Sequence, residues 1–336
     1  MIEAAIRDVR DGHSLDRERA RDVMRQIMDG EAEQAEITAF LAALVAKGET
    51  TAEITGFADA MREHVVPVTP TREVVVDIVG TGGDGAGTFN ISTTAALVAA
   101  TAGAAVAKHG NRAASSACGA ADVLEALGFD LDQQPERIAE SIDRFGFGFM
   151  FARAHHPAMR HAAPSRQELG TRTVFNILGP LSNPAGARDG VFGVYSTDLA
   201  LTYAETLAGL GARRAFVVHG DGGLDELSPT GVNVVVEVVN GEIHEWELDP
   251  RSLGVYPADP ASLRGGSAAE NAAALRAVLA GERSGRRDAV LLNAGAALVA
   301  AGIADDIGEG FAIAAEAIDS GAAATRLDDL REFSNG

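Results

Sequence analysis

Cysteine and lysine are almost absent from this chain of 336 residues. The single cysteine, Cys118, excludes an internal disulfide bond, so the cytoplasm is the simplest location to expect. The only lysines are Lys47 and Lys108, and every other basic side chain besides histidine is an arginine. Salt adaptation would produce such an acidic, lysine-poor surface, although a GC-rich genome also replaces lysine by arginine.

Positive charge is scarce as well, because the chain has 28 basic and 48 acidic residues and its formal net charge is −20. Duplex nucleic acid and anionic membranes are bound by cations that meet phosphates, so this balance predicts neither partner. The longest weakly apolar run, residues 95–107, is too short to cross a bilayer. The first residues, MIEAAIRDVRDG, are charged from the start and hold no signal-peptide core.

The chain is long enough for two domains. Residues 1–64 have the spacing of amphipathic helices; in DRERARDVMRQIMDG, for example, Val23, Ile27 and Met28 fall on one stripe. The prolines of VVPVTPTR mark a linker, and a strand–loop–helix rhythm follows from Val74. This alternation predicts an α/β fold with a mainly parallel sheet covered by helices on both faces, beside a small all-helical N-terminal domain.

The expected strands cover residues 74–79, 104–107, 148–151, 190–195 and 215–219. A hairpin is expected at Asn240-Gly241, which separates two strand-like runs. The expected helices of this part cover residues 93–102, 120–127, 136–145, 199–210, 269–279 and 310–318.

The stretch VVVDIVGTGGDGAGTFNISTTAAL, residues 74–97, places five glycines between a strand and a helix. Backbone N–H groups of such a loop, together with those of the helix N-terminus, suit a phosphate. The dinucleotide signature is not completed, because Lys108 stands in the region where a carboxylate is expected. The Walker A pattern fails too, since Thr88 and Phe89 follow Gly87. A tight turn that binds nothing is the alternative.

Ligands of open α/β sheets sit beyond the carboxyl ends of the strands, where three unusual loops are expected. The first covers residues 80–90, the second is KHGNRAASSACG and the third is HGDGGLDELS. In the third, Asp225 and Glu226 suit Mg²⁺, which takes carboxylates, waters and substrate phosphates, and Ser92 could add a hydroxyl. Adjacent acids on a solvated surface are the alternative.

The second loop begins with Lys108, a mobile ammonium at a strand end that suits a phosphate. His109 alone is better read as structural, whereas Asn111 beside Gly110 offers a donor and an acceptor to a ligand. Further along the chain, one of three arginines could form a forked pair with a substrate carboxylate. These arginines are Arg160, Arg166 and Arg172.

Seven motifs occur in order: GTGGD, NIST, KHGNR, ADVLEALG, HPAM, RTVFNILGPLSNP and GLDELSPTG. Together they resemble the anthranilate phosphoribosyltransferases over nearly the whole chain. The resemblance implies transfer of phosphoribose from phosphoribosyl pyrophosphate (PRPP) to anthranilate in tryptophan biosynthesis, with Mg²⁺. It also implies a homodimer made through the helical domain. That domain would join residues 1–66 to about 157–180, leaving 73–156 and 181–336 for the phosphoribosyl-binding domain.

The resemblance also implies roles for individual residues. Those expected at PRPP are Gly80, Gly83, Asp84, Thr88, Asn90, Ser92, Thr93, Lys108, Gly110, Asn111, Ser115, Ser116 and Ala120. Those expected at anthranilate are Gly80, His109, Asn111, His156 and Arg166, and those expected at the metal are Ser92, Asp225 and Glu226. One departure stands out, because Ala120 replaces the serine usual in the family and offers PRPP no hydroxyl.

Two other functions stay open at this point. A pyrimidine nucleoside phosphorylase shares the fold but would use a nucleoside and inorganic phosphate; the acid pair and the FNILGPLSNP turn favour the transferase. A non-catalytic relative that binds nucleic acid should lose the acid pair and gain a basic face, which the net charge of −20 does not favour.

Overall fold

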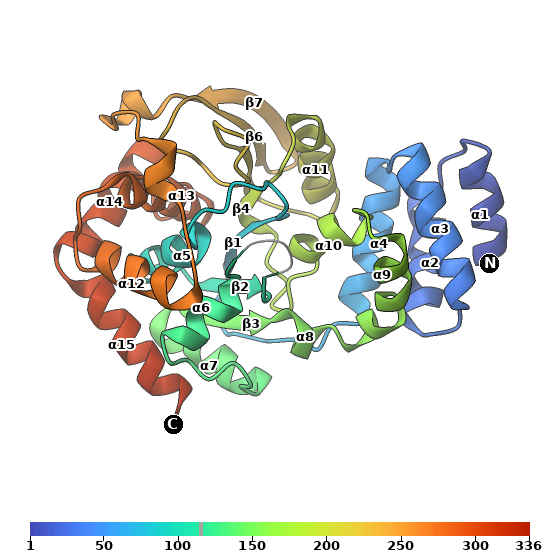
Figure 1. The fold of residues 1–336 in the computed structure, drawn as a ribbon, viewed down its shortest axis with the longest axis horizontal. Coiled ribbons are helices and arrows are strands. Elements are labelled where there is room, and N and C mark those ends of the chain that lie inside the picture. Colours follow the sequence, from blue (N-terminus) through green and yellow to red (C-terminus); the bar gives the residue numbers. More distant parts are fainter. Residues whose placement is uncertain (114–116) are drawn as a thin grey trace.

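A mixed β-sheet forms the centre of the larger lobe. The structure, a computed structural model, describes residues 1–113 and 117–336, and in these its sheet has seven strands in the order β3-β2-β1-β4-β5-β6-β7 (Figure 1). The strands are β1 (Val76–Gly80), β2 (Val106–Gly110), β3 (Phe147–Phe151), β4 (Asp189–Gly193), β5 (Arg214–His219), β6 (Asn233–Val239) and β7 (Glu242–Leu248). The pairs among β1 to β5 are parallel, and β6 and β7 add an antiparallel hairpin at one edge.

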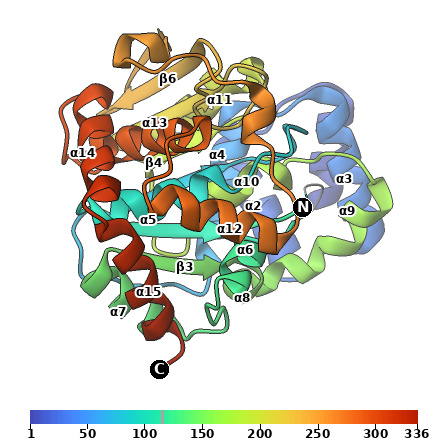
Figure 2. The same ribbon diagram turned by 60° about the vertical axis from the view of Figure 1, so that its left-hand side comes forward.

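Helices cover both faces of this sheet, as the alternating sequence predicted. One face packs against α5 (Ile91–Thr101) and α13 (Gly285–Ala300), with α6 (Ala120–Ala126), α12 (Ala268–Leu279), α14 (Ile307–Asp319) and α15 (Ala322–Ser334) further out (Figure 2). The opposite face packs against α11 (Thr197–Gly209), and α7 (Pro135–Phe145) lies against β3. The 3₁₀ turns η2 (Pro250–Leu253) and η3 (Pro260–Leu263) connect β7 to α12.

The N-terminal helices form a second lobe at the right of Figure 1. They are α1 (Ile2–Arg10), α2 (Arg17–Met28), α3 (Gln34–Lys47) and α4 (Thr51–Glu63). A later segment of α8 (Ala152–His155), η1 (Pro157–His161), α9 (Ala163–Leu169) and α10 (Phe175–Leu181) follows β3. Ser165 of α9 donates a hydrogen bond to the carbonyl of Gln34, at 3.1 Å, and α10 packs against α4. The later segment therefore contacts the N-terminal helices.

The apolar core of the helical lobe is continuous with one face of the sheet. Buried side chains of α2 and α4 belong to the same cluster as Phe192 of β4 and Tyr203 of α11. The stripe predicted from sequence is correct, since Val23, Ile27 and Met28 are all buried there. The two lobes are therefore held together by hydrophobic burial as well as by the chain that connects them.

Most predicted elements were found close to their expected bounds, and the Asn240-Gly241 hairpin is confirmed by the pairing of β6 with β7. Sequence reasoning covered α1 only within the helical region 1–64, and it did not assign α13 or α15. The start of the FNILGPLSNP stretch, expected to be a turn, forms α10. The α13 stretch is nearly all small and apolar, so it lacks the polar face by which an amphipathic helix is recognised. No helix in the described ranges is long and apolar enough to cross a membrane.

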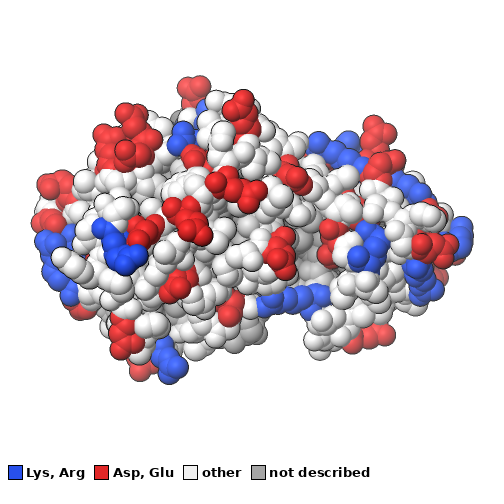
Figure 3. Space-filling view, turned by 90° about the horizontal axis from the view of Figure 1, so that it is seen from above, with Lys and Arg blue, Asp and Glu red and all other residues white. Residues whose placement is uncertain are grey.

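Charge is spread unevenly over the surface. On the face shown in Figure 3, acidic side chains are scattered over the larger lobe, and no continuous basic patch covers it.

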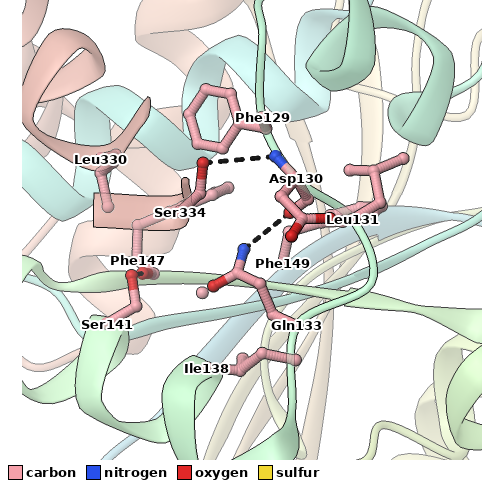
Figure 4. A pocket seen from close by; sticks show the side chains of 11 residues that line it. Phe129, Asp130, Leu131, Gln133, Ile138, Ser141, Phe147, Phe149, Leu330 and Ser334 are labelled. Atoms are coloured by element: carbon pink, nitrogen blue, oxygen red, sulfur yellow. Dashed lines mark hydrogen bonds between the residues drawn. The ribbon is translucent and has the colours of Figure 1, made fainter. Parts of the chain in front are cut away.

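A small cavity of about 10 Å³ lies under α15 and β3, where the Ser334 hydroxyl accepts a hydrogen bond from the N–H of Asp130 at 3.3 Å (Figure 4). A cavity of this size holds one water molecule at most, so it is not a substrate site.

Glu53 carries a buried charge inside the helical lobe. Its side chain is fully buried and accepts hydrogen bonds from the N–H groups of Leu15 and Thr50, at 3.0 and 2.8 Å. The ammonium of Lys47 lies 2.9 Å from the same carboxylate. Glu53 thereby connects the start of α2 to the junction between α3 and α4.

We predict that Glu53→Leu lowers the free energy of unfolding by about 3–5 kcal/mol, because it leaves the Lys47 charge without its buried partner. Urea denaturation followed by circular dichroism measures this. The exposed Glu31→Leu serves as the matched control and should change the free energy by less than about 0.5 kcal/mol. Equal effects of the two substitutions would contradict the role of the buried pair.

Candidate active site

Three loops meet at the carboxyl ends of the parallel strands. β1 lies between β2 and β4, so the strand order reverses direction there, which is where open α/β sheets bind ligands. Asp225, after β5, accepts from the N–H of Gly82, after β1, at 2.6 Å. Asn90 donates to the carbonyl of Cys118, after β2, at 3.2 Å. The three loops therefore contact one another at this edge of the sheet, which agrees with their predicted meeting at the strand ends.

The glycine loop after β1 adopts a backbone that side chains would hinder. Gly82, Gly83, Gly85 and Gly87 all have positive φ, between 61° and 80°. Gly80 has a different reason to be glycine, since a Cβ there would lie 2.1 Å from a carboxylate oxygen of Asp225. The glycines thus serve both the turn and the close approach of the acid pair.

The acid pair lies against the N–H groups of the loop and of α5. Glu226 accepts from the N–H of Ser92, in the first turn of α5, at 2.9 Å. Burial, together with the nearby Asp84 carboxylate, raises the pKa of Asp225 to about 6. Burial and the charge of Asp225 also hold the pKa of Glu226 well above its usual range. Three half-buried carboxylates, those of Asp84, Asp225 and Glu226, thus lie close together with little positive charge around them.

Lys108 is the cation nearest to these acids, but it is not the mobile side chain that we expected. It is 2% exposed, and its ammonium donates to the carbonyl of Ile78 at 2.7 Å. Burial lowers its pKa, while Asp77, Glu226 and Asp225 oppose that shift. The β-strand periodicity explains the difference, because the side chain of Lys108 points into the sheet core rather than beyond the strand end.

The residues present fit Mg²⁺ bound jointly with a phosphate substrate. Within residues 1–113 and 117–336, no three His, Cys, Asp or Glu side chains are arranged to hold a metal by themselves. Mg²⁺ typically takes only one or two protein carboxylates and completes its shell with waters and phosphates. The under-compensated charge of Asp225 and Glu226 is suited to such a cation.

Two hydroxyls, one directly after β1 and one in the first turn of α5, have no partner among the described residues. The hydroxyl of Thr93 is buried without a hydrogen bond among the described residues, and so is that of Thr81. Asn90 is the N-cap residue of α5, yet its side chain makes no capping bond. Such orphaned donors at a helix N-terminus are what a bound phosphate would satisfy.

A cleft of about 800 Å³ extends from these loops toward the helical lobe. It is lined by Gly80, Asn111, His109, His156 and Arg166 among others, so the five residues expected at anthranilate are brought together. Arg166, on α9, has its guanidinium 5.5 Å from the ring centre of Phe175 and makes no ion pair in the described part of the chain. Burial lowers its pKa. It is a half-buried cation that lacks an anion.

The two histidines of the cleft are uncharged. Burial lowers the pKa of His156 to about 4 and that of His109 well below its usual value. His109 Nδ1 lies 3.1 Å from the carbonyl of Gly179, so Nδ1 carries the hydrogen and Nε2 is an acceptor. His156 Nε2 lies 3.2 Å from that acceptor and must donate to it. The pair forms a neutral wall of the cleft, with neither Nε2 free to take a proton.

The second loop is only partly described. Ser115 and Ser116, both expected at PRPP, lie outside the described residues. Gly110 ends β2, and a Cβ there would lie 3.0 Å from the methyl of Ala120, at the start of α6. Ala120 therefore packs against Gly110, which itself lines the cleft.

Sequence reasoning missed several residues that shape the site. Asp77 is fully buried in β1 and accepts from the side chain of Asn183 at 2.7 Å and from the N–H of His109 at 3.3 Å. Burial raises the pKa of Asp77 to about 6, against the effect of Lys108. A lone Asp within the β-branched run VVVDIVG was the available signal. Gly193 had no such signal, although a Cβ there would lie 1.5 Å from the carbonyl oxygen of Asp225.

The sequence matches two family descriptions. Residues 3–65 match "Glycosyl transferase family, helical bundle domain", and residues 72–324 match "Glycosyl transferase family, a/b domain". The anthranilate phosphoribosyltransferase of Methanocorpusculum labreanum is 50% identical, over 100% of this chain and 99% of that protein. The enzyme of the same description from Pelotomaculum thermopropionicum is 53% identical, over 99% and 96% of the two chains.

Solved structures give the same result. The crystal structure of anthranilate phosphoribosyltransferase from Thermus thermophilus matches with a TM-score of 0.94 and 50% identity, over 99% of each chain. The Saccharomyces cerevisiae enzyme, solved in complex with PRPP and Mg, matches with a TM-score of 0.90 and 29% identity, over 99% of this chain and 98% of that one. With two lobes, three converging loops and full-length relatives in common, this chain belongs to the anthranilate phosphoribosyltransferase family.

Proposed function

We propose that this protein transfers the 5-phosphoribosyl group of PRPP to the amino group of anthranilate, releasing pyrophosphate, in the presence of Mg²⁺. The observation that supports the proposal is that two parts of the site, which differ in the chemical groups they present, lie next to each other. One is the N–H-rich loop with the acid pair, and the other is the cleft wall with Arg166. The yeast relative has been solved with PRPP and Mg, and also with 4-fluoroanthranilate.

The pyrophosphate of PRPP would rest on the glycine loop and the first turn of α5. Gly83, Thr88, Asn90 and Thr93 supply backbone N–H groups and hydroxyls there, and the helix dipole favours the anion. Bound Mg²⁺ would neutralise charge on the departing pyrophosphate. Asp225 and Glu226 would hold that ion, together with the hydroxyl of Ser92.

The reaction itself needs few protein groups. The amine lone pair forms a bond to ribose C1 while the bond from C1 to the pyrophosphate oxygen breaks, so inversion at C1 is expected. The attacking nitrogen then loses a proton to solvent. Arg166 and Asn111 would align the amine through the anthranilate carboxylate and its neighbouring atoms, which is a proximity effect. No nucleophilic Ser or Cys is required.

We also propose how the chain is divided and assembled. Residues 1–66 with about 157–180 would form the helical domain, and residues 73–156 with 181–336 the phosphoribosyl-binding domain. Contacts between α9 and α3 support this division. A homodimer through the helical domain is supported by apolar exposure at Met1 and Val45, which are 65% and 42% exposed. The single cysteine supports a cytoplasmic location.

The proposed reaction is tested directly by anthranilate fluorescence, which should fall when PRPP and Mg²⁺ are added together. Omitting either one should leave the fluorescence unchanged. A parallel reaction with a pyrimidine nucleoside and inorganic phosphate should release no free base. Phosphorolysis without loss of anthranilate would replace the proposal by nucleoside phosphorylase activity.

We predict that Arg166→Ala raises the KM for anthranilate by about 10–100-fold, the factor expected when a charge-assisted hydrogen-bond pair is lost. The KM for PRPP should change less than about twofold in steady-state kinetics, because Arg166 lies on the opposite wall of the cleft from the glycine loop. Arg160→Ala, on the same wall, is the control and should have a smaller effect. Equal changes in both KM values would remove Arg166 from the anthranilate site.

We predict that activation by Mg²⁺ weakens as the pH falls through about 6, because the pKa of Asp225 is raised to about 6 and this carboxylate becomes protonated there. The pKa of Glu226 is raised as well, so protonation of the pair acts in the same direction. The Mg²⁺ concentration that gives half-maximal rate should therefore be higher at pH 5.5 than at pH 7.5. The double substitution of Asp225→Asn and Glu226→Gln should remove this pH dependence together with most of the activation. Asp221→Asn, an exposed acid of the same loop, should behave like the unaltered protein; if the double variant does so too, the pair is not the metal site.

A further inference from the structure

The N-cap residue of α5 is turned away from the helix that it begins. An Asn at this position normally accepts a hydrogen bond from the second or third N–H of the helix. Here Asn90 makes no such bond, and its φ and ψ of −72° and 72° are unusual for a cap. The second N–H, of Ser92, donates to Glu226 instead. The third, of Thr93, donates no hydrogen bond within the part of the chain that the structure describes.

Asn271 is the side chain that holds Asn90 in this position. It lies in the first turn of α12, is 2% exposed, and its amide nitrogen donates to Asn90 Oδ1 at 2.8 Å. On its other side, Asn271 Oδ1 accepts from the N–H of Gly266 at 2.8 Å. Asn90 Nδ2 in turn donates to the carbonyl of Cys118 at 3.2 Å.

These bonds form a relay with one possible direction. A backbone N–H stands at one end, at Gly266, and a backbone carbonyl stands at the other, at Cys118. The side-chain amides of Asn271 and Asn90 must therefore each turn their oxygen toward the Gly266 end and their nitrogen toward the Cys118 end. Asn90 Oδ1, the atom that would cap α5, is thereby engaged by Asn271.

Residues 263–271, the segment that contains Asn271, also form backbone hydrogen bonds with the end of the glycine loop. The N–H of Phe89 donates to the carbonyl of Leu263, and that of Gly265 donates to the carbonyl of Gly87, both at 2.9 Å. A Cβ at Gly265 would lie 2.7 Å from the carbonyl oxygen of Thr88. Residues 263–271 therefore pack directly behind the last residues of the glycine loop, and Asn271 is their side-chain contact with it.

We propose that Asn271 is a positioning residue that keeps the N-terminus of α5 uncapped for the pyrophosphate of PRPP. This inference rests on the proposed function. Without the donor of Asn271, the Asn90 side chain keeps two contacts with Cys118: Nδ2 donates to the carbonyl at 3.2 Å, and the thiol donates to Oδ1 at 3.5 Å. We expect Asn90 Oδ1 to exchange the weak thiol contact for the stronger N–H donor of Thr93. The protein would then satisfy its own helix, and the pyrophosphate would have to displace that bond before it could bind.

The test is a double-mutant cycle read by two measurements, the KM for PRPP and the affinity for pyrophosphate with Mg²⁺ by calorimetry. Asn271→Ala should raise the KM for PRPP and lower the affinity for pyrophosphate by about tenfold each, which corresponds to the free energy of one capping hydrogen bond. The KM for anthranilate should change by less than about twofold. In the background of Asn90→Ala, which has no capping oxygen, adding Asn271→Ala should cost less than about twofold further.

Two further variants keep the test decisive. Asn271→Asp retains the acceptor for Gly266 and removes the donor to Asn90, but it also adds a negative charge. It replaces Asn271→Ala if that variant does not fold, and its effect is then read as the difference between the backgrounds with and without the Asn90 side chain, because the added charge is common to both. Asn335→Ala is the matched control, because its amide bonds the carbonyls of Gly128 and Arg331, at 2.8 and 2.7 Å, near the C-terminus. It should bind PRPP like the unaltered protein.

An unchanged affinity for pyrophosphate in the Asn271 variants would overturn the inference. So would an equal loss in the presence and absence of the Asn90 side chain, which would mean that Asn271 acts only through residues 263–267. Failure of the proposed function looks different. In that case the unaltered protein would consume no anthranilate, whereas the pyrophosphate titration would still report on Asn271.

Discussion

The site depends on the close contact of buried carboxylates with backbone N–H groups at the ends of neighbouring strands. Asp225 accepts from Gly82 and Glu226 from Ser92, so the acid pair fixes the glycine loop and α5 relative to β5. These contacts require the backbones to approach more closely than side chains allow, which explains glycine at positions 80 and 193. The shortage of nearby positive charge then makes the same carboxylates suited to a cation.

The two parts of the site differ in the charge of the group that each is suited to bind. In the proposed reaction the glycine loop and α5 would supply N–H groups for a highly charged pyrophosphate, which is favourable because the groups are fixed in advance. The other wall is largely apolar and holds two neutral histidines, so a planar aromatic acid meets little competing charge there. Three arginines also line the cleft, and of these Arg153 and Arg160 are exposed, whereas Arg166 is half-buried on a helix that packs against the other lobe. Substrate orientation therefore depends on how the two lobes are packed.

Much of this site was predictable from sequence because its residues lie in short local motifs. The GTGGD loop and the Asp225–Glu226 pair each follow a strand, and the ends of parallel strands must lie at one edge of the sheet. The expectation for Lys108 was wrong, since a mobile ammonium that reaches a phosphate was expected, and the side chain instead donates to the carbonyl of Ile78 inside the fold. Asn271 carried no signal, because it stands in an alanine-rich helix 181 residues away from Asn90.

The sequence by itself determined the strand and helix alternation, the phosphate-binding character of the glycine loop and the chemistry of the acid pair. These follow from local backbone preferences and side-chain charge, which do not need distant neighbours. Only the tertiary structure decided which groups are buried and which donors are already used. It buried Lys108 and Asp77 together, fixed the tautomers of the paired histidines and turned Asn90 away from α5. Burial and hydrogen-bond partners are set by segments far apart in the chain, and no local pattern encodes them.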